Sequence, residues 1–157
     1  MGMTFGSIYN DRLIEAKKLI VKTMPELKNN SYNIRWYKFE NTTDFSNDDA
    51  IVCACTAIDE YGDKCIIVNN DYRKEDLRAL ACLLAHELTH VLKTPTLEEE
   101  IQAYKNEAKA WDKLKSDDIK PSELTKLLDF ISLIHKQGEI EQYITNSDFY
   151  INKLNLS

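Results

Sequence analysis

Residues that build flexible linkers are scarce in this sequence. The 157 residues include only four glycines and three prolines, too few for a mobile connection between domains. The sequence also contains no internal repeat and no low-complexity tract, which excludes repeat architectures. Since the length suits one compact unit, we expect residues 1–157 to form a single domain.

Long apolar runs and an excess of basic residues are also missing. No apolar stretch approaches the length of a membrane-spanning helix, and the start of the chain lacks the basic and then apolar order of a signal peptide. Lys and Arg number 20 against 26 Asp and Glu, giving a net charge of −6, whereas a nucleic-acid binder normally presents a basic face. These features predict a cytoplasmic protein that binds neither membranes nor nucleic acid.

The four cysteines lack the spacing of a zinc site. Cys53 and Cys55 would share one face of a strand, because side chains alternate along it. The sequence contains no C-x2-C pair, and a chain of this size does not need disulfides to fold. We expect Cys53, Cys55, Cys65 and Cys82 to be free, buried thiols.

The first half of the chain has the pattern of one helix followed by three strands. Residues 7–24 carry apolar side chains at helical spacing and end at Pro25. Residues 32–40 have an approximately alternating pattern typical of a strand. Residues 50–59 and 64–69 flank a glycine-containing turn, which predicts a β-hairpin.

The second half of the chain is helical in pattern from about Tyr72, with breaks at 93–96, 116–121 and near Gly138. Strands followed by helices indicate an α+β fold. We therefore expect an N-terminal helix, a small and mainly antiparallel three-stranded sheet, and a helical C-terminal half.

The most informative segment is His86-Glu87-Leu88-Thr89-His90, which matches H-E-x-x-H. Residues four apart on a helix lie on nearly the same face, so the two imidazoles can bind one metal ion. Glu87 follows beside them, where it can face a metal-bound water. The motif predicts one zinc ion per chain, with His86 and His90 as ligands and Glu87 as the catalytic base. The structural alternative is a buried helix whose histidines are only hydrogen-bonded.

The helix that carries this motif is apolar on two sides. One stripe consists of Leu77, Leu80, Ala81, Leu84, Leu88 and Val91. The opposite side carries Ala79, Cys82, Leu83, His86 and His90. Because a helix that is apolar all round is buried, we expect the histidines to face a partly enclosed cleft.

A catalytic zinc site needs a third protein ligand and an open position. The metzincin extension of the motif is absent, since Lys93 and Thr96 stand where its glycine and histidine would be. Pro95 breaks the helix, and Thr96 begins a capping-box sequence that uses Glu99 at the N-terminus of a new helix. One face of that helix presents Glu100, Ala103, Tyr104 and Glu107. Either glutamate can return to the metal if the two helices form a hairpin.

In these residues the sequence resembles the gluzincin metallopeptidases, in which H-E-x-x-H is followed by a glutamate on the next helix. The segment from Glu100 to Tyr104 looks like that ligand helix, and Ile66–Asn69 resembles the edge strand that pairs with substrate in zincins. The likeness covers residues 50–112, and the ImmA/IrrE-like regulatory proteases are the nearest intracellular analogy. It implies a zincin-like fold with an edge strand at the cleft, a peptide or protein substrate, and Glu100 as the third zinc ligand.

Glu107 competes with Glu100 for that role, because Asn106-Glu107-Ala108 is similar to the sequence around the thermolysin-type ligand. With Thr96 as N-cap, Glu100 lies in the first turns of its helix, and Glu107 lies roughly 10 Å further along the axis. In a tight hairpin, the end of the first helix opposes the start of the second. Glu100 is therefore favoured, provided that the first helix ends before Lys93.

These features combine into a small zinc-dependent peptidase in which Glu87 accepts a proton from zinc-activated water. The resulting oxyanion needs a further donor, for which His135 and Tyr104 are candidates. Each also has a structural explanation: His135 lies near a helix C-terminus, and Tyr104 can pack beside the metal. A zinc-binding regulatory protein without turnover and a helical protein with a fortuitous motif are the competing hypotheses. The presence of Glu87 favours the enzyme, because zinc binding needs only the ligands.

Overall fold

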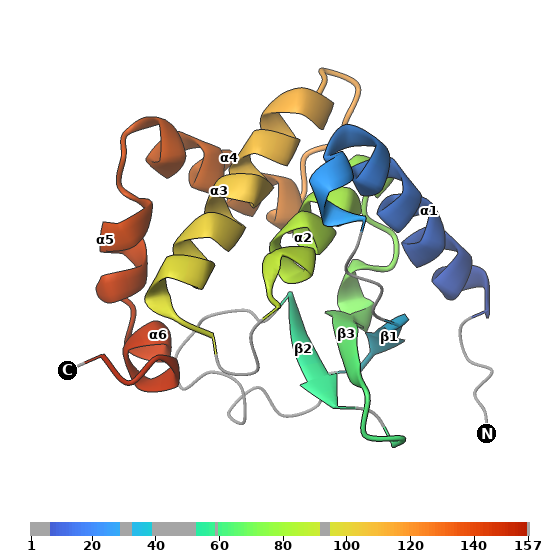
Figure 1. The fold of residues 1–157 in the computed structure, drawn as a ribbon. Coiled ribbons are helices and arrows are strands. Elements are labelled where there is room, and N and C mark those ends of the chain that lie inside the picture. Colours follow the sequence, from blue (N-terminus) through green and yellow to red (C-terminus); the bar gives the residue numbers. More distant parts are fainter. Residues whose placement is uncertain (1–6, 29–32, 39–52, 59, 92–94, 157) are drawn as a thin grey trace.

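The computed structural model describes residues 7–28, 33–38, 53–58, 60–91 and 95–156. Within them the fold is α+β and mainly helical, as predicted (Figure 1). The helices are α1 (Ser7–Thr23), α2 (Leu77–Thr89), α3 (Leu97–Leu114), α4 (Glu123–Lys136), α5 (Ile140–Thr145) and α6 (Asp148–Lys153). The strands are β1 (Asn33–Tyr37), β2 (Ala54–Ile58) and β3 (Lys64–Asn69). None of the helices in these ranges is both long and apolar enough to span a membrane.

β3 is the central strand of the sheet. It pairs in parallel with β1 on one side and antiparallel with β2 on the other. The β2–β3 pair is the predicted hairpin, and its turn contains Gly62, whose φ of 83° lies in the left-handed region that favours glycine.

The expectation of a mainly antiparallel sheet with Ile66–Asn69 at its edge is wrong. The sheet is mixed, and the strand carrying those residues is flanked on both sides. β3 is buried from Cys65 to Asn69, a continuous run that suits a strand covered on both faces. In the part of the sheet that the structure describes, β1 and β2 form the edges, and β2 contacts α2 (Figure 1).

α2 is the buried helix that the sequence predicts. The Asp76 side chain begins it by accepting a hydrogen bond of 2.9 Å from the Arg78 amide. Every residue from Ala79 to Leu88 is buried. The helix ends at Thr89, and His90 has extended backbone angles, φ −75° and ψ 115°. Val91, predicted to extend the apolar stripe, therefore follows the helix end and is exposed.

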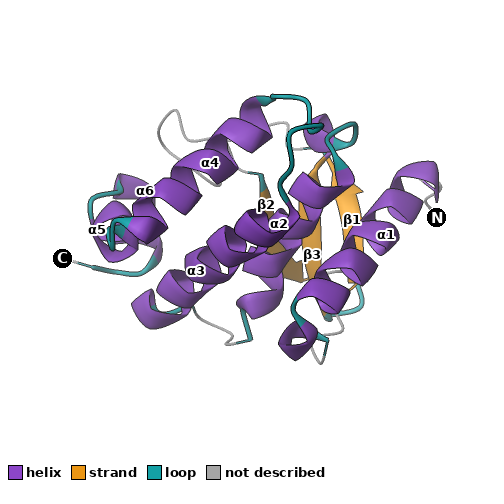
Figure 2. Cartoon of the chain, turned by 90° about the horizontal axis from the view of Figure 1, so that it is seen from above, coloured by secondary structure: helices purple, strands orange, loops and turns teal. Residues whose placement is uncertain are grey.

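The apolar side chains form two clusters. The larger one, here called the sheet core, joins α1, the sheet, α2 and parts of α3 and α4. The smaller one, here called the C-terminal core, joins α3 and α4 to α5 and α6; its buried members are Tyr104, Ala108, Ile131, Ile134, Ile140, Ile144 and Tyr150. Seen from above, α1 and the sheet lie on one side of the molecule, and α5 and α6 lie together at the opposite end (Figure 2).

Candidate metal centre

α2 and α3 pack side by side, and the end of α2 lies near the start of α3 (Figure 1). Thr96 caps α3 as predicted, its hydroxyl accepting a hydrogen bond of 3.1 Å from the Glu99 amide. A hydrogen bond joins the two helices where the Asn106 amide group donates to the Thr89 hydroxyl at 2.9 Å. Since α2 ends before Lys93, the condition that favours Glu100 is met.

Three buried side chains converge between these helices. Nε2 of His86 and Nε2 of His90 lie 3.3 Å and 3.4 Å from Oε1 of Glu100. One ligand atom from each of the three residues lies within 4.8 Å of the others, a grouping that can hold a metal ion. Their exposed fractions are 7%, 4% and 0%. The structure thus brings together the three predicted ligands.

The other ring nitrogen of each histidine contacts a carboxylate. Nδ1 of His86 lies 2.8 Å from Oε1 of Glu107, and Nδ1 of His90 lies 2.8 Å from Oε1 of Glu99. A histidine whose Nδ1–H donates to a carboxylate presents Nε2 to a metal, in a fixed ring orientation. Glu107, the competing ligand candidate, therefore lies behind His86 and outside the group of three.

The position of the Glu99 carboxylate is a finding that the sequence did not indicate. Sequence analysis assigned this residue to the N-terminus of α3, and its backbone amide does bond to Thr96. Its carboxylate instead contacts His90 through Oε1 and accepts a hydrogen bond of 3.0 Å from the Val91 amide through Oε2. Glu99 thus links the first turn of α3 to the last residues of the H-E-x-x-H segment.

Oε1 of Glu100 is the atom that tests whether a metal fits. It is buried and accepts no hydrogen bond from the residues that the structure describes; the polar atoms that face it are Nε2 of His86 and of His90. A buried carboxylate oxygen is unfavourable unless a hydrogen-bond donor or a cation lies beside it. Because Nε2 atoms of two imidazoles lie at similar distances from it, a cation between the three would satisfy the oxygen. The donor set therefore fits a divalent metal ion.

Charges around the group perturb its titration. Burial alone would lower the pKa of His86, but the carboxylates of Glu100 and Glu107 outweigh burial and raise it to about 10. Burial would raise the pKa of Glu100, and the imidazoles of His86 and His90 reverse this and lower it. Burial raises the pKa of Glu107. A bound metal ion would take the place of the protons on this network.

Glu87, the predicted catalytic base, lies on the same side as the group. Its side chain is buried, with 7% of the residue exposed, and Oε2 is 3.9 Å from Nε2 of His86. That is the ring nitrogen that also faces Glu100. A carboxylate at this position can reach a molecule bound beside the group.

The two predicted oxyanion donors have different surroundings. The Tyr104 ring packs edge-on against His86, with centroids 4.5 Å apart, and its hydroxyl lies 2.5 Å from that of Tyr150. Tyr104 thus packs beside the group, as its structural explanation predicts. Burial and positive charges lower the pKa of His135; the charged side chains that act on it are Lys109, Lys105, Asp112 and Lys136. None of these belongs to the metal group, and His135 is not among the three grouped residues.

α6 supplies a contact to the group that no sequence signal indicated. Lys153, the last residue of α6, donates a hydrogen bond of 3.3 Å from Nζ to Oε2 of Glu100. The two residues are 53 positions apart in the sequence. Only the fold reveals this ion pair, because neither periodicity nor motif spacing relates residues at such separation.

The cysteines lie outside the group, and the four of them form no disulfide, as predicted. Cys65 and Cys82 are buried, and Cys53 and Cys55 are partly buried. Burial raises the pKa of both Cys53 and Cys55 to about 12. Burial therefore disfavours the thiolate form of both side chains in this fold.

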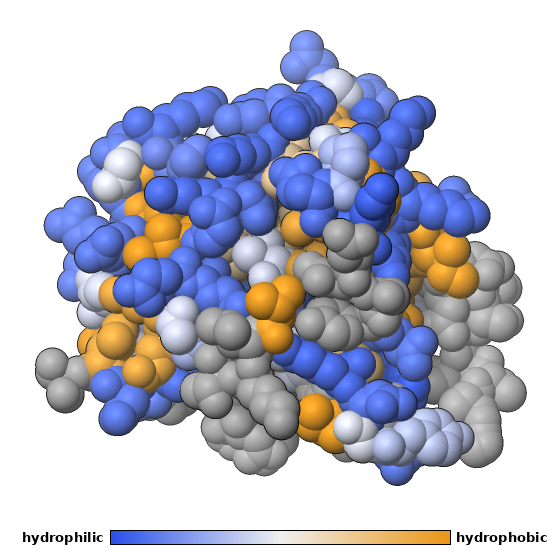
Figure 3. Space-filling model, viewed as in Figure 1, coloured by the Kyte–Doolittle hydropathy of each residue, from blue (hydrophilic) through white to orange (hydrophobic). Residues whose placement is uncertain are grey.

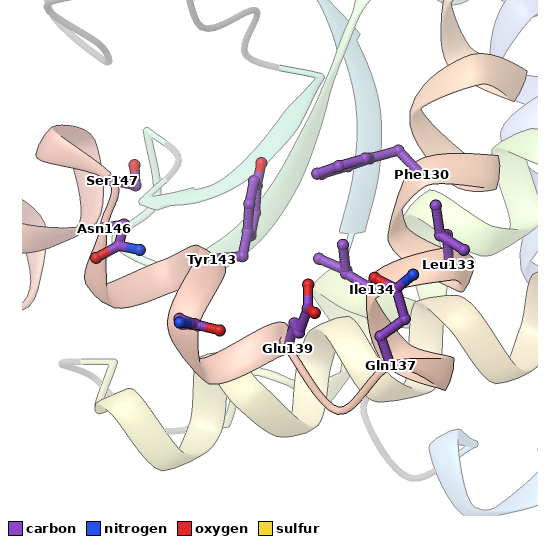
Figure 4. Close-up of a pocket in the computed structure, with 9 residues that line it drawn as sticks. Phe130, Leu133, Ile134, Gln137, Glu139, Tyr143, Asn146 and Ser147 are labelled. Atoms are coloured by element: carbon purple, nitrogen blue, oxygen red, sulfur yellow. The ribbon is translucent and has the colours of Figure 1, made fainter.

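A separate hollow lies between α4 and α5 (Figure 4). Phe130, Leu133 and Ile134 of α4 line one side of it, and Tyr143 of α5 faces them, its ring 5.5 Å from that of Phe130. None of the three metal-binding candidates lines this hollow. The three metal-binding candidates thus lie apart from this hollow.

Comparison with protein-family models, with curated proteins and with solved structures finds no match to this chain. The functional argument therefore depends on the geometry of the group and on the chemistry of its residues.

Proposed function

We propose that this protein is a zinc-dependent peptidase with a zincin-like active site. His86, His90 and Glu100 hold the metal ion, and Glu87 is the general base. The substrate is a peptide or protein chain. The observation that carries this proposal is the buried group of two imidazoles and one carboxylate, with an unpartnered oxygen at its centre.

The donor set supports zinc as the metal. Two imidazole nitrogens and one carboxylate oxygen form a set that zinc accepts, and a catalytic zinc site has three protein ligands with one position left for water. The carboxylates on Nδ1 of both histidines support the same conclusion, since they orient the rings and increase their basicity. When bound, the metal supplies an activated water at neutral pH.

Glu87 supports an enzyme over a site that only binds metal. Its carboxylate is not one of the three grouped ligands, yet it lies 3.9 Å from a nitrogen that is. From there Oε2 can accept a proton from a water and pass it to the leaving amine. A protein that merely stored or was stabilised by zinc would have no chemical need for this carboxylate.

The proposal is tested with purified protein expressed in zinc-supplemented medium. We expect about one zinc per chain and cleavage within a peptide library. Glu87→Gln should retain the metal and lower the cleavage rate by roughly 10²-fold or more, because it removes the base and keeps the shape. Glu98→Gln, at an exposed position on α3, is the matched control and should leave both unchanged.

Two results would contradict the proposal. Protein without near-stoichiometric zinc would exclude the metal site. A zinc-loaded protein that cleaves no peptide in the library would instead favour the competing hypothesis of a zinc-binding regulatory protein without turnover.

A further inference from the structure

Lys153 is neither a proposed metal ligand nor the proposed general base, yet it contacts Glu100. Its Nζ lies 3.3 Å from Oε2 of Glu100, while Oε1 of the same carboxylate faces His86 and His90. The two oxygens of one fully buried carboxylate therefore have different neighbours. One faces the space between the imidazoles, and the other binds an ammonium group.

Aromatic contacts hold this lysine in place. Its ammonium lies over the rings of Phe149 and Tyr150, 5.6 Å and 5.7 Å from their centroids. The Tyr150 hydroxyl contacts that of Tyr104, whose ring packs on His86. The side chain of Lys153 is 36% exposed, so part of it is in contact with solvent. Figure 3 shows hydrophobic side chains gathered over α6 beside the C-terminus.

The carboxylates around the metal group make a nearby positive charge important. Glu87, Glu99 and Glu107 all lie against the two histidines, and Glu100 lies between them. Like charges at such short range repel strongly where water is excluded. A positive charge stabilises Glu100 in this position, and a metal ion, a protonated histidine or Lys153 can supply it.

We propose that Lys153 is a positioning residue that serves as the internal counter-cation of the metal centre. Its ammonium compensates Glu100 when no metal is bound and so keeps the ligand in position. A divalent ion bound between the three ligands is then repelled by the same fixed positive charge. This inference depends on the metal site of the proposed function and is independent of peptide cleavage.

Thermodynamic linkage predicts the direction in which metal affinity changes when the Lys153 charge is removed. Lys153 stabilises the metal-free protein more than the metal-bound protein, because the metal ion neutralises Glu100 in the second state. Removing the charge must therefore lower the stability of the metal-free protein and raise its affinity for the metal. A purely structural role in docking α6 would also lower stability, but would leave metal affinity unchanged or reduce it.

The test compares the full-length protein with Lys153→Met. Zinc affinity is measured by competition with a chromophoric chelator, and the Tm is measured on the metal-free proteins. We expect Lys153→Met to bind zinc roughly 10-fold or more tightly than the unmodified protein and to melt at a lower temperature without metal. If Lys153→Met does not fold, Lys153→Gln removes the same charge and retains a polar side chain.

Two variants serve as controls. Lys153→Arg keeps the charge and should keep the original zinc affinity. Lys136→Met removes a lysine that also ends a helix and pairs with a carboxylate, Asp112 at 3.6 Å, but outside the metal group; it should not change zinc affinity. Tighter binding confined to the neutral Lys153 variants would support the inference.

The outcomes separate this inference from the proposed function. If the unmodified protein binds zinc and the neutral variants bind it equally or less tightly, the role of Lys153 is overturned and the peptidase proposal is unaffected. If the variants bind more tightly but no peptide is cleaved, the role of Lys153 is supported and the peptidase proposal fails. Protein that binds no zinc at all would overturn both.

Discussion

The sheet core and the C-terminal core support the metal centre in different ways. His86 comes from α2, a helix in the sheet core that is buried from Ala79 to Leu88, and His90 is the residue that directly follows this helix. Glu100 lies in the first turns of α3, and Lys153 of α6 reaches it from the C-terminal core. That core includes two helices of six residues each, which are too short to be stable alone. From this difference we expect the protein to hold the two histidines more firmly than Glu100, whose surroundings also include these short helices.

The largest effect expected is on metal binding, and it distinguishes two glutamates on the same helix. Glu100→Ala removes a ligand and should abolish stoichiometric zinc binding. Glu107→Ala removes only the carboxylate behind His86 and should weaken zinc affinity roughly 10- to 100-fold. Zinc content and chelator competition measure both. Strong loss in Glu107→Ala with retention in Glu100→Ala would reverse the two assignments.

Equivalent truncations in the two cores compare their stabilities directly. Leu84 and Ile144 are both completely buried, one in each core. Leu84→Ala should lower the free energy of unfolding of the whole domain by about 2–5 kcal/mol. Ile144→Ala should act mainly on α5 and α6, because the small core can open without the large one. Hydrogen exchange should then accelerate in those helices and remain slow in α2.

Equal acceleration of exchange in α2 and α5 by Ile144→Ala would show that the two cores unfold as one unit. The histidines and Glu100 would then not differ in how firmly the protein holds them. The melting transition provides a second measure: we expect Ile144→Ala to leave the transition of the sheet core in place.

The smallest effect concerns the first turn of α2. Asp76 caps this helix and pairs with Arg78, whose hydrogen bonds lower the pKa of Asp76 in the fold. Its stabilisation is therefore complete above the unfolded-state pKa, ~3.9, and is lost as the pH falls through the lower folded-state value. Asp76→Ala should cost about 1 kcal/mol at pH 7 and less in strong acid. Denaturant titrations at several pH values measure this, and a difference that does not change with pH would contradict it.

Local patterns predicted much of the fold and most of the candidate site. The spacing of His86 and His90, the Thr96 cap and the break after α2 all depend on neighbours within a few residues. These interactions favoured Glu100 over Glu107 as the residue facing the histidines, and the structure has Glu100 there. The β2–β3 hairpin was predictable for the same reason, since its turn joins adjacent segments.

What the sequence did not predict depends on contacts between distant segments. The sheet has β3 at its centre, buried along most of its length and paired with β1. The sequence pattern shows where the strands are, but it does not give their order in the sheet. Lys153 had no distinguishing pattern because its partner is far away in the chain. The role of the Glu99 carboxylate was missed for another reason. A glutamate three residues after Thr96 fits a capping box, but in the fold its carboxylate contacts His90.

The sequence separations of these contacts also set an order of assembly. His90 and Glu99 are 9 residues apart, His86 and Glu107 are 21 apart, and Glu100 and Lys153 are 53 apart. The entropy lost on closing a chain segment grows with its length, by about 0.6 kcal/mol for each doubling. The two histidines and their carboxylates therefore form a short helical hairpin that can close first and quickly. During synthesis, the three ligand candidates leave the ribosome before Lys153, so on our proposal a nascent chain could bind a metal ion before the competing ammonium is in place.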